Sequence, residues 1–143
     1  MTNLNNILIK EVTTKRELKL FAQFGIDLYK GNPYYCPPIF FDEVNTFKPN
    51  SNPALEVCDF VLYMAYRDNK IVGRIAGIIN HRANEAWGVK KCRFGWFDFV
   101  DDYDVFKALL LSKRAVRSTA NPAGDRIPPL LMLRKRFFAR ILL

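Results

Sequence analysis

The sequence predicts one layered domain of the α/β kind, in its α+β form, with a mixed sheet that carries helices on both faces. Three observations predict this class: a hairpin of two strongly apolar runs at residues 59–81, an amphipathic helical pattern at 14–31, and an aromatic run at 92–100 that leads into a second helical pattern. Strands that are apolar on both faces belong in the middle of a sheet covered on each side. A chain of 143 residues, half of them apolar, can build such a core as one domain.

The first two elements are a short strand and a helix. Residues 7–12 (ILIKEV) favour a strand, and Thr14, three residues before Glu17, forms a capping box that starts a helix. Gly31-Asn32-Pro33 ends this helix, because the glycine accepts positive φ and the proline cannot continue the hydrogen-bond ladder. The apolar stripe expected to face the core consists of Leu18, Phe21, Phe24, Gly25 and Leu28.

A proline-rich connection follows, with five of the eight prolines between residues 32 and 53. Within it, PPIFFDEVNTF predicts a brief helix or turn held against the core by Ile39, Phe40 and Phe47. We expect an ordered connection with covered aromatic side chains, since otherwise they would face water.

The hairpin at 59–81 turns at Asp68-Asn69, a pair that tolerates the positive φ that a two-residue loop demands. Gly73 and Gly77 fall on the same face of its second strand and leave room for a close neighbour. A helix lying on the sheet is the favoured neighbour, and a ligand is the alternative.

In the strand at 92–100, alternation predicts Phe94, Trp96 and Asp98 on one face and Gly95, Phe97 and Phe99 on the other. Asp104 or Asp102 then caps a helix whose Phe106, Leu109 and Leu110 can face the sheet.

Several polar residues are candidates for a site. Arg74, in an apolar strand, is either an anion contact or a side chain whose guanidinium reaches solvent. His81 and Glu85, with Asn80 and Asn84, form either an acid/base cluster or a solvated loop. Asp98, among aromatic residues, needs a partner or a raised pKa, so it is the candidate to test first.

Charge and cysteine content exclude several classes. Residues 1–112 hold 14 Lys and Arg against 13 Asp and Glu, so the formal charge of +8 belongs mostly to residues 113–143. Cys36, Cys58 and Cys92 lack metal-ligand spacing, so we expect no metal, and their surroundings suit buried reduced thiols. Without a signal peptide or an apolar run of about 18 residues, we expect a cytoplasmic protein.

Taken together, residues 6–112 resemble the amino-terminal part of bacterial GNAT-like acyltransferases. The resemblance rests on the stretches NPYYCPP, VGRIAGIINHRANE and FGWFDFVDD. It implies an acyl-CoA-dependent N-acyltransferase, with acetyl-CoA or another acyl-CoA and a small-molecule amine as its partners. In that family the strand matching Phe94–Val100 runs beside the pantetheine arm and the next turn receives the pyrophosphate, so the resemblance implies Phe97, Phe99, Val100 and Asp101 as cofactor contacts. It identifies no catalytic residue.

The turn itself argues against phosphate binding. Usual members of the family place a glycine-rich turn there, whereas this chain has Asp101, Asp102 and Asp104. Carboxylates are good caps for a helix start but repel a pyrophosphate. A capped structural junction is therefore favoured over a cofactor cradle.

The resemblance stops near Lys113, and residues 113–143 hold eight basic residues and one acid. We expect this tail to be a frameshifted or unrelated continuation of a truncated domain that is inactive alone. The strand at 92–100 would then be an exposed edge open to homo-oligomer pairing. The alternative is a small binding module whose basic tail contacts an anionic membrane or nucleic acid.

Overall fold

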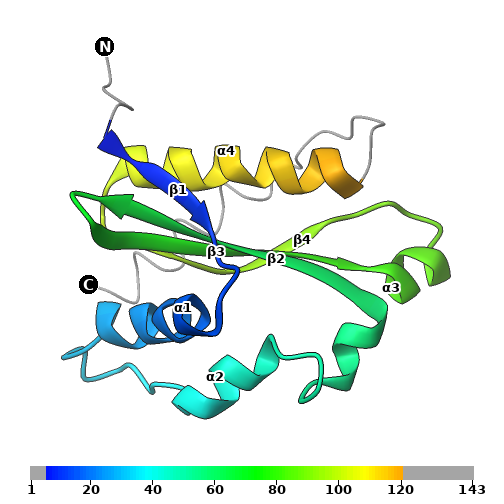
Figure 1. Cartoon of the computed structure of the whole chain (residues 1–143), viewed down its shortest axis with the longest axis horizontal. Helices are drawn as coiled ribbons and strands as arrows, with labels where there is room; N and C mark the ends of the chain where they lie inside the picture. The colour runs from blue at the N-terminus through cyan, green and yellow to red at the C-terminus, as the bar shows by residue number, and fades with distance from the viewer. Residues whose placement is uncertain (1–5, 121–143) are drawn as a thin grey trace.

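The structure, a computed structural model, describes residues 6–120 of the chain and the side chains of residues 6–112. A four-stranded sheet with the order β1-β2-β3-β4 has α1 and α2 on one face and α4 on the other (Figure 1). The α+β class with helices on both faces is therefore confirmed. The elements are β1 (Leu8–Glu11), α1 (Lys15–Leu28), α2 (Phe40–Thr46), the 3-10 helix η2 (Pro53–Val57), β2 (Cys58–Arg67), β3 (Lys70–Asn80), α3 (His81–Ala86), β4 (Arg93–Phe99) and α4 (Tyr103–Ala120).

The described sheet is antiparallel throughout and not mixed, which corrects the prediction. Parallel neighbours need a crossover of about a dozen residues or more. Only Asp68 and Asn69, at φ 48° and 62°, join β2 to β3, as a tight hairpin turn of the predicted kind. The short helix α3, which was not predicted, returns the chain from β3 to β4 at the same end of the sheet.

The first core cluster lies between the sheet and the pair α1 and α2. The predicted capping box of α1 is present, with Glu17 N donating to Thr14 Oγ1 and Thr14 N donating to the Glu17 carboxylate. The buried residues of this first core cluster are Phe21, Phe47, Leu62, Met64 and Ala76. The helix predicted in the proline-rich connection exists as α2, but Ile39 does not hold it to the core, because that side chain is 68% exposed.

The second core cluster lies under α4. Val105 and Leu109 of α4 are buried against Ala65 and Ile75 of the sheet. A Cβ on Gly73 would lie 2.7 Å from Leu109 Cδ1, so the missing side chain is what lets α4 approach. The helix interpretation of Gly73 is therefore confirmed.

A bulge in β4 changes the predicted faces of that strand. Gly95 pairs with Ala76 and Asp98 pairs with Arg74, so Trp96 and Phe97 together stand opposite the single residue Ile75. Trp96 adopts φ 47° there. The prediction that Phe94 shares a face with Trp96 is wrong, because the extra residue reverses the alternation and places Phe94 with Phe97 and Phe99 under α4.

The cysteine prediction is also corrected, because Cys36 is exposed and Cys58 and Cys92 are half-buried. Within the described residues, no helix is both long and apolar enough to cross a membrane. The predictions for residues 121–143 lie outside the described residues, as do those for the side chains of residues 113–120.

Candidate functional site

Arg74 is the centre of a buried polar cluster between α1 and the sheet. Its side chain is 7% exposed, so the prediction of a guanidinium that reaches solvent is wrong. Nε and Nη2 both lie 2.8 Å from Asp98 Oδ2, while Nη1 donates to the Phe21 carbonyl of α1 at 2.7 Å. The guanidinium also lies over the Phe21 ring, 5.1 Å from its centroid. Arg74 thus joins β3 to β4 and both strands to α1.

Asp98 has the partner that its half-buried position requires. Besides Arg74 on Oδ2, Tyr29 Oη donates to Asp98 Oδ1 at 2.8 Å. The pKa of Tyr29 is raised well above its ordinary value, first by burial and then by the charge of Asp98 and the hydrogen bond to it. Both oxygens of Asp98 are therefore used within the fold.

Glu43 of α2 completes the cluster at the bulge of β4. Trp96 Nε1 donates to Glu43 Oε2 at 2.9 Å, and Arg74 Nη1 lies 3.8 Å from the same oxygen. This bond and the edge contact of the Trp96 ring with Phe47 hold a bulky residue in the left-handed region, which is a strained backbone conformation for it. The cluster thus contains one guanidinium and two carboxyl groups, from Arg74, Asp98 and Glu43.

Of the two alternatives for the polar residues after β3, the structure supports an exposed, solvated segment and not an acid/base cluster. His81 Nε2 lies 2.7 Å from Asp59 Oδ2 of the neighbouring strand, and both side chains are exposed. Asn80 instead caps α3 by accepting from Ala83 N, and Asn84 donates to the Lys91 carbonyl. The side-chain amides of Asn80 and Asn84 therefore form hydrogen bonds with nearby backbone groups.

The acidic turn is a capped junction. Asp102 Oδ1 accepts from Asp104 N at 2.8 Å and from Val105 N at 3.3 Å, so Asp102 is the cap of α4. Its other oxygen pairs with Arg67 Nη1 at 2.6 Å, and this bond, more than the backbone bonds, lowers the pKa of Asp102. Because these N–H groups and the neighbouring cation already have a carboxylate partner, the turn does not fit a cofactor pyrophosphate.

The outer edge of β4 is the second candidate surface. Val100 N donates to Val72 O, and residues in an antiparallel ladder alternate between bonded and unbonded pairs. The N–H and C=O of Phe99, one residue earlier, therefore point away from β3. In the described sheet β4 is paired on one side, so this backbone faces an open edge, as the sequence predicted.

Phenylalanine side chains of β4 and α4 pack together on the face of β4 that α4 covers. The rings of Phe97 and Phe99 lie 5.1 Å apart, and Phe106 of α4 lies 5.7 Å and 5.5 Å from them. Phe97, Phe99, Val100 and Asp101 are thus adjacent along the edge and the turn that follows, and their role as cofactor contacts stays a prediction.

Sequence reasoning found Arg74 and Asp98 but missed their partners Tyr29 and Glu43, and it named Trp96 only as a residue on one face of its strand. The contacts join residues that are distant in sequence: 69 residues separate Tyr29 from Asp98, and 53 separate Glu43 from Trp96. Glu43 is an acid in the first turn of α2, and Tyr29 directly follows α1, so each position is explained by its own helix. No sequence pattern therefore indicated that either residue belongs to the buried cluster.

Comparison with curated proteins gives two distant relatives. Protein YghO of Escherichia coli is 32% identical over 111 residues, which cover 76% of this chain and 28% of that protein. Bacterial ceramide synthase of Caulobacter vibrioides is 29% identical over 99 residues, which cover 68% of this chain and 26% of that protein. The chain thus matches only about a quarter of the length of each relative. No family model and no solved structure matches the chain.

Proposed function

We propose that residues 6–112 form part of an acyltransferase domain that resembles acyl-CoA N-acyltransferases and is inactive in this chain alone. The similarity to a protein named as a ceramide synthase carries the proposal, because a ceramide contains an amide between an amine and an acyl group. The proposed reaction is the transfer of an acyl group to an amine, and the cytoplasm is the proposed compartment.

Two features of the molecule support this assignment. The backbone of Phe99 faces the open edge of β4, where an extended acyl-donor arm could lie along the strand, as the family resemblance implies. The bulge at Trp96 lies on the same strand, and the Trp96 ring binds Glu43 of α2. Glu43 thus supplies a carboxylate near that edge.

Two other features support inactivity of the chain alone. The turn after β4 does not fit the donor's phosphates, because its carboxylates already cap α4 and pair Arg67. The relatives are also about four times as long as the matched part, so the match leaves most of each relative uncovered. We therefore expect isothermal titration of the full chain with acetyl-CoA and with a long-chain acyl-CoA to give no binding. Micromolar affinity for either would contradict the inactivity of the chain alone.

The relation to acyltransferases is tested by a chimera in which residues 6–112 replace the matching stretch of the Caulobacter protein. We expect the chimera to form ceramide in cells that lack the native enzyme, with the remainder of the Caulobacter protein holding the donor's phosphates. The control is the Caulobacter protein with the matching stretch deleted, which should form no ceramide. A folded, soluble chimera that forms no ceramide would overturn the proposal.

A further inference from the structure

We propose that two copies of this chain pair along the outer edge of β4, as antiparallel strands related by a two-fold axis. In the described sheet β4 is bonded only to β3, and the N–H and C=O of Phe99 point away from that neighbour. Unpaired backbone groups on a strand edge are a template for another strand. The opposite edge of the described sheet is β1, which has four residues against seven in β4, and very short edge strands pair poorly.

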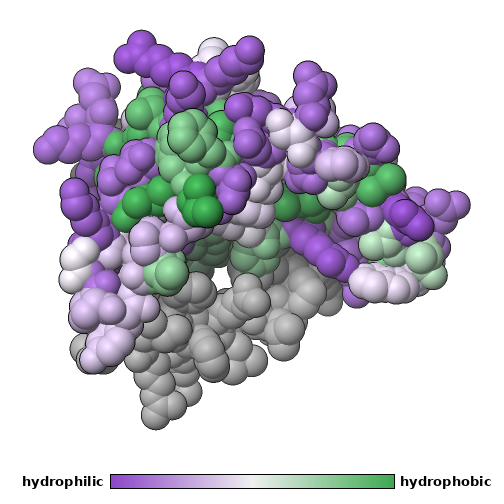
Figure 2. All heavy atoms as spheres, turned by 90° about the horizontal axis from the view of Figure 1, so that it is seen from below, coloured by the Kyte–Doolittle hydropathy of each residue, from purple (hydrophilic) through white to green (hydrophobic). Residues whose placement is uncertain are grey.

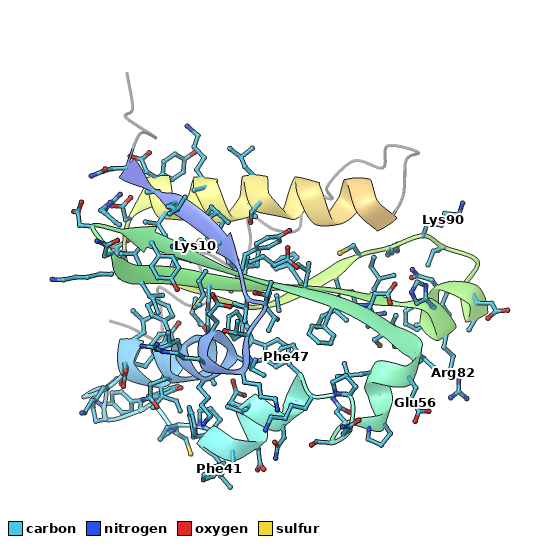
Figure 3. The ribbon with its side chains drawn as sticks, in the orientation of Figure 1. Lys10, Phe41, Phe47, Glu56, Arg82 and Lys90 are labelled. Carbon is cyan, nitrogen blue, oxygen red and sulfur yellow. The ribbon has the colours of Figure 1, made fainter. Side chains whose placement is uncertain are left out.

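Charges of opposite sign lie at the two ends of β4. Lys90 and Lys91 precede the strand and Arg93 begins it, whereas Asp101 and Asp104 follow it. The first four of these residues are exposed, and Figure 3 shows Lys90 pointing outward from the connection between α3 and β4. Within the part of the chain that the structure describes, none of these four side chains forms an ion pair. They are therefore available to a partner.

This charge pattern is self-complementary in one orientation only. Antiparallel pairing about a two-fold axis near the middle of β4 brings the end that carries Arg93 beside the end of the second copy that leads to Asp101. Symmetry repeats the contact, so each copy contributes its basic end once and its acidic end once. Parallel pairing would instead set like charges side by side, which is destabilising.

Aromatic side chains beside the edge add an apolar contact. Phe97 and Phe99 of β4 pack with Phe106 of α4, and Tyr103, which stacks on Phe106, is 59% exposed. A two-fold axis perpendicular to the sheet continues the α4 face of one copy into the α4 face of the other, so these two groups of rings would meet. On the α1 and α2 side of the described residues, seen in Figure 2, apolar side chains lie among polar ones.

Charge in the part of the chain that carries the edge does not oppose the pairing. Residues 1–112 hold 14 basic and 13 acidic residues and are therefore nearly neutral. The proposed acyl-donor arm would lie along the same edge, so a paired chain is closed to the donor, in agreement with a chain that is inactive alone. The pairing itself does not rest on the proposed acyl transfer, because it uses backbone, charge and ring contacts only.

The test is sedimentation velocity of the full chain over a range of concentrations, at low and at high salt. We expect a reversible dimer that weakens at high salt, which screens the ion pairs at the ends of β4. Arg93→Glu and Asp101→Arg, each alone, place like charges together and should raise the dissociation constant of the dimer at least about tenfold. The matched control is Arg16→Glu, which makes the same change of charge at an exposed residue of α1 and should leave the dissociation constant as it is.

Two further measurements separate a lost contact from a lost fold. When Arg93→Glu and Asp101→Arg are mixed in equal amounts, they should pair with each other, because both ends of the interface then join opposite charges. In the native chain, the amide of Phe99 should exchange hydrogen more slowly at concentrations that favour the dimer than after dilution.

A chain that stays monomeric, single variants that pair as the native chain does, an equal loss in Arg16→Glu, or a mixture that does not pair would each overturn the proposal. Protection of the Phe99 amide that is the same at every concentration would also overturn it, because another segment of the same chain would then occupy the edge. None of these results bears on the acyl transfer, which the chimera tests separately.

Discussion

Arg74 and Asp98 face each other across β3 and β4, and two guanidinium nitrogens lie 2.8 Å from the same carboxylate oxygen, Oδ2 of Asp98. The side chains are 7% and 15% exposed, so the pair lies largely away from water. A buried pair contributes little net stability compared with apolar residues of similar size, but removing one partner leaves an uncompensated charge.

We therefore expect Arg74→Met to lower the free energy of unfolding by about 3–5 kcal/mol, measured by urea denaturation with circular dichroism. Adding Asp98→Leu should recover part of this loss, because it removes the stranded carboxylate. Arg67→Gln is the control, since it breaks the Arg67–Asp102 pair, which is about one-third exposed, and its effect should be much smaller. Equal effects of the two arginine substitutions would show that burial of the Arg74 pair has no special importance.

Gly25 of α1 gives the guanidinium its space. A Cβ at this position would clash with Nη2 and Cζ of Arg74. Alanine favours a helix interior over glycine by about 1 kcal/mol, yet we expect Gly25→Ala to destabilise the chain by about 1–3 kcal/mol because Arg74 must move. Gly95→Ala serves as the control, because a Cβ there meets no heavy atom within 4 Å. A stabilised Gly25→Ala variant would mean that Arg74 relocates freely.

Tyr29→Phe tests the remaining partner of Asp98. The variant loses a hydrogen bond to a carboxylate, so we expect it to unfold at a free energy lower by about 1.5–3 kcal/mol near neutral pH. Because the folded pKa of Tyr29 is raised above the ordinary 10.0, the native chain should lose stability as the pH rises beyond about 10, and the variant should lose less. Urea midpoints across alkaline pH measure this difference. Tyr34→Phe, at a side chain that is 86% exposed, should leave the profile as it is in the native chain.

Asp102→Asn isolates the charge at the start of α4, because asparagine also caps helices. The pair with Arg67 and the backbone bonds lower the pKa of Asp102 below its ordinary 3.8. Its contribution is therefore complete above that pH and is lost as the pH falls through the folded pKa. We expect a lower urea midpoint for the variant at about pH 7, and nearly equal midpoints once the carboxylate is protonated in acid. A difference that persists unchanged in acid would contradict this role.

Local patterns in the sequence predicted most of the elements. The capping box at Thr14, the Asp68-Asn69 turn and the aspartate cap of α4 are each set by neighbours within four residues, and all three are confirmed. The helix α3 was missed because its six residues form less than two turns, too few for a periodic pattern.

Features that depend on residues far apart in the sequence could not be predicted from local patterns. Trp96 is an unexpected residue at positive φ, since this conformation is rare outside glycine, asparagine and aspartate. Nothing local therefore signals the bulge, and alternation assigned Phe94 to the wrong face. Likewise, the rule that aromatic side chains avoid water predicted a covered proline-rich connection, but Tyr34 and Phe41 are exposed.

The bulge in β4 also affects how a change in chain length would act. Deletion of one residue between Gly95 and Phe97 would restore simple alternation and turn either Phe94 or Asp98 toward the opposite layer of helices. An aromatic ring would then compete with Arg74 for space, or a carboxylate would enter the apolar layer under α4. We therefore expect gaps in alignments of related sequences to fall outside this stretch of β4.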